Sequence, residues 1–143
     1  MLKIRSEQME AFQPVAEAAF ERRVVEHLRE HHSDTVIQLP AEVVPLKQVS
    51  DEKLYAMVQA GIGLALAYGM DWESSITAFV VTMFVAAPNF DKHPLIQRVL
   101  NDERVDSNSR MDELWERTSE DNWEAVKRTY DPAAWPNFEG SHQ

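Results

Sequence analysis

A chain of 143 residues fits a single domain and is long enough to bury about 70% of the surface that its unfolded form exposes. It carries 24 acidic and 14 basic residues, a net charge of −10, and residues 101–143 alone account for −6. Such a surface repels phosphate backbones and anionic lipids, so we exclude nucleic-acid binding and expect a basic protein partner. Because cysteine is absent, disulfides and thiolate metal sites are excluded as well.

No segment has the features of a secretory signal or of a membrane span. The N-terminus becomes acidic at Glu7, before any apolar run develops. The longest nearly apolar run, at 76–88, is shorter than the roughly 20 residues that a bilayer-spanning helix needs. We therefore expect a soluble, cytoplasmic protein without membrane insertion.

The first 50 residues predict one long helix followed by a loop. After Ser6, which suits an N-cap, apolar side chains recur every four residues as far as about His32. They are Phe12, Ala16, Phe20, Val24 and Leu28, with Met9 on the same side. Pro14 interrupts this pattern, and we expect it to kink the helix. Residues 33–50 lack helical periodicity, and a strand at 35–39 would have no partner in an all-helical chain, so we predict a loop.

Two apolar helices follow, separated by Gly69. Ser50 is the predicted N-cap of the first, which has one face of larger apolar side chains and an opposite face of small ones. The first face holds Leu54, Val58, Ile62 and Ala65, and the second holds Ala56, Ala60, Gly63 and Ala67. Because small side chains let another helix approach closely, we expect both faces to be covered. Asp71 is the predicted cap of the next helix, whose scarcity of polar residues over 72–87 predicts a buried central position.

The C-terminal half predicts two further helices and a tail. Pro94 suits the first position of a short helix that extends to Leu100. A last helix is predicted from about Arg110 to Tyr130, burying Met111, Leu114, Trp115, Thr118, Ala125 and Val126. Together the elements predict an all-α fold, a compact single-domain bundle of about four to five helices over 1–131. Residues 132–143 are predicted to form an irregular tail that contains aromatic residues.

One pattern is typical of metal chemistry. His27, Glu30 and His31 match the H-x-x-E-H signature of inverted zinc metallopeptidases, in which two histidines hold zinc and the glutamate acts as general base. The pattern lies at a helix end and has no evident third ligand, so we favour a structural role for it. The chain also lacks a phosphate-binding glycine loop and a nucleophile elbow. We therefore expect neither an enzyme nor a cofactor or metal, with a small metalloenzyme as the least favoured alternative.

The C-terminal third carries the residues best suited to binding a protein. Glu116 and Glu120 belong to an acidic patch at helical spacing, and Trp123 and Tyr130 lie at the edge of the apolar stripe. Trp135 and Phe138 add two tail aromatics to them. Because aromatic side chains are favoured interface anchors, we predict that Trp123, Tyr130 and Trp135 bind a partner and that the two glutamates orient it. The alternative is a solvated acidic face and a tail that folds back, so that the rings bury one another.

Several segments together resemble a known group of bacterial proteins. These are the turn at 68–71, the apolar helix after it, the turn at 89–91, the segment 95–100 and the opening residues 4–9. With them the chain resembles small uncharacterised helical proteins encoded beside PAAR-tip and toxin genes of type VI secretion systems in Gram-negative bacteria. The resemblance implies a cytoplasmic accessory to effector loading, such as a co-chaperone or adaptor that binds an effector chaperone. It carries no functional residue across.

The sequence therefore predicts a non-enzymatic adaptor or co-chaperone that binds an effector or an effector-chaperone complex. The alternative is an immunity protein that plugs the active site of a toxin, because an acidic protein suits the basic groove of a nuclease. Oligomeric state and the identity of the partner stay open at this level.

Overall fold

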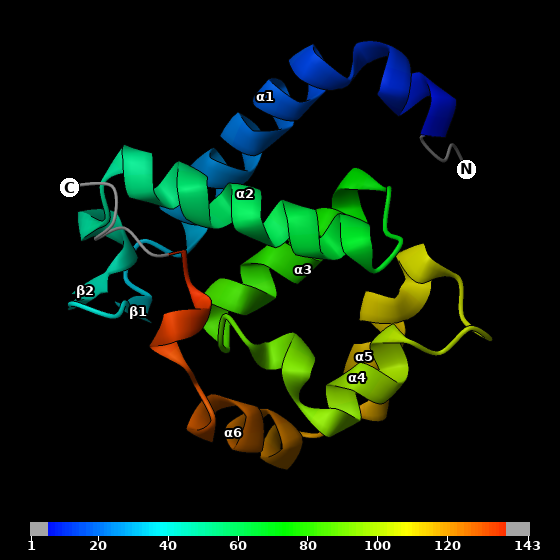
Figure 1. The fold of residues 1–143 in the computed structure, drawn as a ribbon. Helices are drawn as coiled ribbons and strands as arrows, with labels where there is room; N and C mark the ends of the chain where they lie inside the picture. Colours follow the sequence, from blue (N-terminus) through cyan, green and yellow to red (C-terminus); the bar gives the residue numbers. More distant parts are fainter. Residues whose placement is uncertain (1–5, 137–143) are drawn as a thin grey trace.

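The structure, a computed structural model, describes residues 6–136, with side chains described from residue 18 onward. Figure 1 shows a mostly helical molecule in which three longer helices cross one another and three shorter ones follow. The helices are α1 (Ser6–His31), α2 (Asp51–Ala67), α3 (Glu73–Val85), α4 (Pro94–Leu100), α5 (Arg110–Arg117) and α6 (Glu120–Arg128). A hairpin of β1 (Val36–Gln38) and β2 (Val43–Pro45) follows α1, and short 3-10 helices lie at Leu46–Gln48, Phe90–Lys92, Ser107–Ser109 and Pro132–Ala134. A largely α-helical fold is thus confirmed, but the described part has six α-helices rather than four or five, and a small sheet.

Helix α3 lies at the centre of the core, as its apolar sequence predicts. Its side chains Ile76, Phe79, Val80, Met83 and Phe84 are each at most 2% exposed. It contacts α1, α2 and α5, so that neighbours cover it on several sides. Full burial of such a side chain is worth roughly 1.5–3 kcal/mol, and α3 therefore supplies much of the apolar burial that stabilises the fold.

The backbone before α3 is held by a side chain from a distant loop. Asn108 Oδ1 accepts hydrogen bonds from the backbone N–H groups of Asp71 and Trp72, at 2.9 and 2.8 Å. Asn108 Nδ2 in turn donates to the Asp71 carboxylate at 2.7 Å. The prediction of Asp71 as the N-cap is therefore wrong: Trp72 occupies that position, and Asp71 instead holds the buried amide that binds this turn.

Helix α2 is fully buried on one face. The larger apolar face, from Leu54 to Ala65, is buried as predicted. The opposite face of small residues is covered only in part, since Ala56 and Ala60 are half-buried but Gly63 and Ala67 are exposed, so the prediction that it is covered is wrong for its second half. The close approach occurs instead at Gly61, where an added Cβ would lie 3.0 Å from Met83 Sδ on α3. A glycine on the buried face, rather than the small residues opposite, lets α2 and α3 pack closely.

Residues 36–45 form a two-stranded hairpin, so the loop predicted here is wrong. The strand at 36–38 finds its partner only a few residues further along the chain, and the two pair antiparallel. Two backbone hydrogen bonds between Leu39 and Glu42, of 2.8 and 3.4 Å, close the turn. Leu39 and Glu42 form a hydrogen-bonded pair, and hydrogen-bonded and non-hydrogen-bonded pairs alternate along the strands. The pair of Val36 and Pro45, three steps further, is therefore not hydrogen-bonded, so the missing N–H of Pro45 costs nothing.

The predicted last helix is two helices. Thr118 adopts an extended conformation, with φ −117° and ψ 157°, and Ser119 starts α6 through a reciprocal capping box with Asn122. The Thr118 hydroxyl donates to the Leu114 carbonyl at 2.7 Å and so satisfies the open end of α5. The break also changes which side chains are buried: Trp115, predicted to be buried, is 47% exposed.

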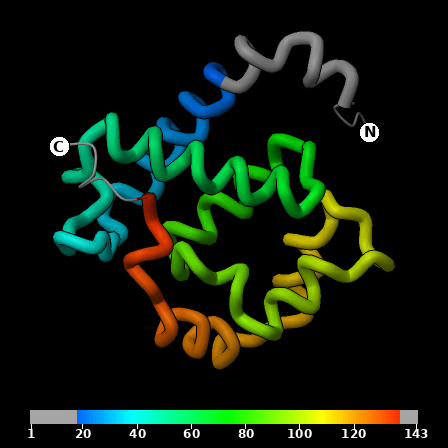
Figure 2. The backbone as a smooth tube through the Cα atoms, in the orientation of Figure 1, coloured from blue at the N-terminus to red at the C-terminus, as the bar shows by residue number. Residues whose placement is uncertain are grey.

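The chain after α6 returns to the hairpin, a path that Figure 2 traces from orange to red. Trp135 is 2% exposed and its ring contacts Phe84 of α3 at 4.9 Å between centroids. Residues 132–135, predicted to belong to an irregular tail, thus form a 3-10 helix and a core contact. Phe138 lies outside the described residues.

Helix α1 has the predicted extent, and its stripe is buried at Phe20, Val24 and Leu28. The side chains of the earlier stripe residues and of Pro14 lie outside the part whose side chains are described, so the predicted kink stays a prediction. Among the described helices, none combines the length and the apolar character that crossing a bilayer requires.

Candidate protein-interaction surface

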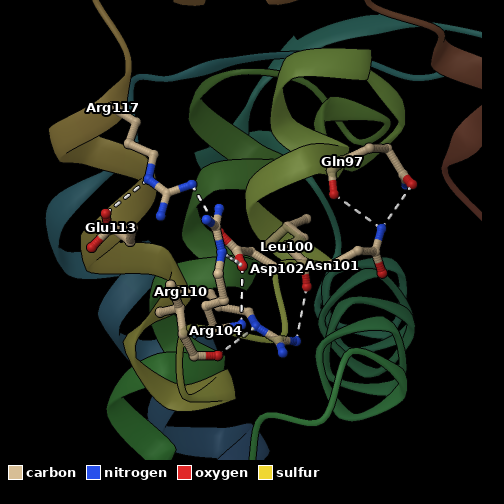
Figure 3. Close-up of polar contacts among 9 residues, drawn as sticks. Gln97, Leu100, Asn101, Asp102, Arg104, Arg110, Glu113 and Arg117 are labelled. Carbon is tan, nitrogen blue, oxygen red and sulfur yellow. Dashed lines mark hydrogen bonds and ion pairs between the residues drawn. The ribbon is translucent and has the colours of Figure 1, made fainter.

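A network of charged side chains fixes the start and the exposed face of α5 (Figure 3). Asp102, in the loop after α4, accepts hydrogen bonds from Arg104 and from Arg117, the latter at 3.1 Å. Arg117 also donates to Glu113 one turn earlier, at 2.8 Å. The side chain and the backbone N–H of Arg104, followed by the side chain of Arg117, hold the pKa of the Asp102 carboxyl far below its usual range. Because Arg117 belongs to α5 and Asp102 to the preceding loop, the network joins the two.

Arg110, the first residue of α5, joins three separate segments through their backbone carbonyls. Its guanidinium donates to the carbonyl oxygens of Leu100 at 2.8 Å, Val105 at 3.1 Å and Tyr68 at 3.2 Å. Figure 3 shows the bonds to the loop that precedes α5. These bonds tie α5 to the ends of α4 and α2, so its outward face has a fixed orientation relative to the core.

An aromatic stack leads from the core to the surface at the α5–α6 junction. The rings of Trp115 and Trp123 stack at 4.7 Å between centroids and 30° between planes. Behind them Phe90 lies 6.3 Å from Trp123 and 5.0 Å from Phe79 of α3. Trp123 Nε1 donates to Thr118 Oγ1 at 2.8 Å, which fixes the inner indole. The outermost ring, Trp115, therefore rests on a rigid support.

The two short helices that carry these tryptophans also carry several exposed carboxylates. Asp112, Glu116, Glu120 and Asp121 are all exposed, and within residues 18–136 no ion pair joins any of them to a basic group. We call these four residues with Trp115 and Trp123 the α5–α6 surface. Glu120 and Asp121 also lie in the first turn of α6, where negative charge stabilises the helix. The surface combines uncompensated negative charge with one exposed aromatic face.

The predicted partner-binding residues do not all lie on this surface. Glu116, Glu120 and Trp123 do, whereas Tyr130 is half-buried beside the hairpin and Trp135 is in the core. A buried Trp135 cannot contact a partner in this conformation, so here the alternative of a tail that folds back holds. Trp115 was missed as a surface residue because the sequence was interpreted as one continuous helix. The available signal was Ser119 with Asn122 three residues later, a helix start inside that stretch.

The histidines at the end of α1 do not assemble a metal site. His27 and His31 contact each other at 4.8 Å between ring centroids, and His31 Nε2 lies 3.3 Å from Glu30 Oε1. Burial, with the neighbouring His27 and His31, lowers the pKa of His32. Among the side chains that the structure describes, no group of three or more His, Asp or Glu is placed to hold an ion. Within residues 18–136, no third ligand joins the H-x-x-E-H pattern.

A buried carboxylate elsewhere has a structural explanation. Asp91 is almost inaccessible, and its Oδ2 accepts a 2.9 Å hydrogen bond from Tyr68. Gln97 closes the network by donating to the Tyr68 hydroxyl and to the Asp91 carbonyl, at 3.0 and 2.7 Å. Burial, and then the contact with Asp91, raise the pKa of Tyr68. These groups satisfy one another and join α2 to α4.

Two surface grooves flank α1. One, of about 570 Å³, lies between α1 and α3 and has an apolar floor that includes Phe20, Val24 and Val81. The other, of about 610 Å³, lies between α1 and α2 and is lined by residues of both charges. Neither includes a residue of the α5–α6 surface.

Compared with known proteins, the chain matches no protein-family model, no curated protein and no solved structure.

Proposed function

We propose that this protein is a non-enzymatic adaptor that binds a basic protein partner through the α5–α6 surface. The observation that carries the proposal is Trp115, a large aromatic side chain that is 47% exposed yet held by a rigid stack. Binding hot spots are enriched in tryptophan, and an anchor that is already ordered loses little conformational entropy on binding. The four unpaired carboxylates on the same two helices complement a basic surface.

The resemblance to proteins encoded beside type VI secretion genes supports a narrower proposal. The partner would be an effector, or the chaperone that holds it, and the adaptor would act in the cytoplasm during effector loading. Occlusion is the mechanism that fits such a role: the acidic and aromatic surface covers a basic or apolar region of the partner until delivery.

Affinity capture with matched variants tests the proposal. We expect wild-type protein to retain a partner from cells of its source, and Trp115→Ala to bind that partner at least about tenfold more weakly, as hot-spot truncations do. The control is Leu66→Ala, which truncates another exposed apolar side chain, on α2. If Trp115→Ala binds the partner as tightly as wild-type protein does, the α5–α6 surface is not the binding site.

The two glutamates have a separate kinetic signature. Charge reversal by Glu116→Lys together with Glu120→Lys should slow association and weaken its dependence on salt, because these side chains attract a basic partner from a distance. Glu26→Lys with Glu30→Lys on α1 makes the same change of charge away from the surface. If both double variants slow association equally, the net charge of the protein, rather than the position of the glutamates, determines the rate.

Inhibition of a toxin is the second candidate, favoured by the same acidic surface. A plug for a basic catalytic groove would use Asp112, Glu116, Glu120 and Asp121 as substitutes for phosphate groups. The two functions differ in one measurement: an immunity protein abolishes the activity of its toxin at equimolar ratio, whereas an adaptor binds without inhibiting.

A further inference from the structure

The geometry points to an arginine side chain as the group that the α5–α6 surface recognises, with its guanidinium stacked on the exposed face of Trp115 and its charge balanced by the neighbouring carboxylates. This inference rests on the proposed function and names the chemistry of the partner at that surface.

One face of Trp115 is covered by Trp123, whose indole is fixed to Thr118 and lies within ring contact of the buried Phe90. Trp115 as a whole is 47% exposed, so the stack orders its indole before a ligand binds and leaves part of it accessible. A planar ligand group fits such a surface better than a branched one, because it contacts the whole ring.

Carboxylates share helix faces with the stacked tryptophans. Asp112 lies three residues before Trp115, and Glu120 three residues before Trp123, so each carboxylate shares a helix face with one of the stacked rings. Two nearby basic side chains lie beside other carboxylates: Arg117 binds Glu113 and Asp102, and Lys127 lies 4.0 Å from Glu124. Arg110 donates to backbone carbonyls. Within residues 18–136 no ion pair joins Asp112 or Glu120 to a basic group, so both can balance a cation from outside.

Arginine suits this surface better than an aliphatic side chain or lysine does. An aliphatic side chain would cover the ring but would remove the carboxylates from water without compensation. A lysine would supply the charge, but its compact ammonium cannot stack on the ring as a plane. A guanidinium does both, since it stacks on an indole and presents donors in a fork that matches a carboxylate.

The four tryptophans make the test specific to position. Isotope-labelled protein would be titrated with a short Gly/Ser peptide that carries paired arginines, and the four indole N–H signals followed by NMR. The matched peptides replace arginine with lysine, with citrulline, which keeps the shape without the charge, and with leucine. We expect the Trp115 signal, and less strongly that of Trp123, to shift with the arginine peptide. The signals of Trp72 and Trp135, which lie away from the surface, should not shift.

The affinities provide the quantitative outcome. We expect the lysine peptide to bind about fivefold more weakly than the arginine peptide, from the loss of stacking at an exposed ring, and the citrulline peptide at least about tenfold more weakly. Trp115→Leu should reduce the preference for arginine over lysine to about onefold. Unchanged Trp72 and Trp135 signals in that variant would show that it folds.

Other outcomes would overturn the inference, and they are distinguishable from failure of the proposed function. Equal binding of arginine and lysine peptides would leave an acidic surface without arginine recognition. A preference for the leucine peptide would indicate an apolar partner. If no peptide binds but Trp115→Ala still weakens capture of the partner, the surface binds a protein without recognising arginine. If no peptide binds and Trp115→Ala captures the partner as well as wild-type protein does, the proposed function is wrong too.

Discussion

Single side chains hold this fold together at places where the helices themselves cannot. Asn108 binds two backbone N–H groups and one carboxylate in the turn before α3, while the Ser75 hydroxyl donates to its carbonyl at 2.8 Å. The sequence around Asp71 predicts a local cap, and the structure uses a residue 37 positions away instead. Local propensity cannot reveal such a contact, because it depends on how the loop after α4 folds back.

Removal of the Asn108 amide should destabilise the protein. Asn108→Ala leaves two partly buried N–H groups without an acceptor, so we expect the free energy of unfolding to fall by about 1–3 kcal/mol. Urea titration measures the change. Asn101→Ala is the matched control, since that exposed amide binds only within its own helix end, and its effect should stay within about 0.5 kcal/mol.

Asp102 should make stability depend on acid pH. Its pKa in the folded protein is lowered, chiefly by Arg104, whereas in the unfolded chain an Asp has a pKa of about 3.9. The unfolded state therefore binds a proton more readily, and the stabilisation is complete at neutral pH and lost as the pH falls through and below that value. Asp102→Asn should lower the urea midpoint at pH 7 and flatten its decline in acid. The exposed neighbour Glu103→Gln is the control, and parallel pH curves for Asp102→Asn and wild-type protein would contradict this account.

At the scale of elements, the hairpin is stabilised by a side chain that substitutes for a third strand. The Tyr130 hydroxyl accepts from the Gln38 N–H at 3.2 Å and donates to the Gln38 carbonyl at 3.1 Å, on the edge of β1 that faces away from β2. Trp135 Nε1 donates to the Tyr130 hydroxyl oxygen at 2.8 Å. One hydroxyl thus satisfies the edge of the strand and the indole of the core tryptophan. Burial raises the pKa of Tyr130, in keeping with its position as a neutral donor.

Loss of this hydroxyl should loosen the hairpin selectively. In Tyr130→Phe we expect a fall of about 1–3 kcal/mol in the free energy of unfolding, because the Trp135 indole loses its acceptor. Amide hydrogen exchange should quicken by roughly tenfold at Gln38 and much less at amides in α3. Tyr55→Phe removes a hydroxyl from α2 as a control. Uniform acceleration across the chain would contradict a local role.

The division between α5 and α6 also belongs to this scale. A continuous helix from 110 to 130 would direct Trp115 and Trp123 according to one period, and the sequence was interpreted in that way. The extended Thr118 instead brings the two indoles face to face at 4.7 Å. The candidate site is thus created by a helix break, and its acidic members, Glu116 and Glu120, could be predicted from sequence while its anchor could not.

At the scale of the whole molecule, the contact between α2 and α3 sets the distance at which the longer helices pack. A Cβ added to Gly61 would lie 3.0 Å from Met83 Sδ and 3.1 Å from Val80 Cγ2, so there is almost no room for one. Gly63, two residues later on the same helix, faces open space. The two glycines therefore offer a matched pair for testing the packing.

We expect Gly61→Val to lower the free energy of unfolding by about 1–3 kcal/mol, since the added methyl groups overlap α3 and force the helices apart. Gly63→Val makes the same chemical change without a clash and should alter stability by less than about 0.5 kcal/mol. Chemical denaturation of both variants measures the difference. Similar losses of stability in the two variants would show that the helix propensity of valine, rather than the contact between α2 and α3, is responsible.

The sequence by itself determined the helical class, the extent of α1 and α2, and the burial of α3, because these follow from apolar spacing and from caps within a few residues. Only the tertiary structure decided the support of the hairpin edge by Tyr130, the capping of α3 by Asn108, the burial of Trp135 and the exposure of Trp115. Each of these depends on contacts between residues far apart in the chain or on a break that changes the helical phase, and neither is encoded in local periodicity.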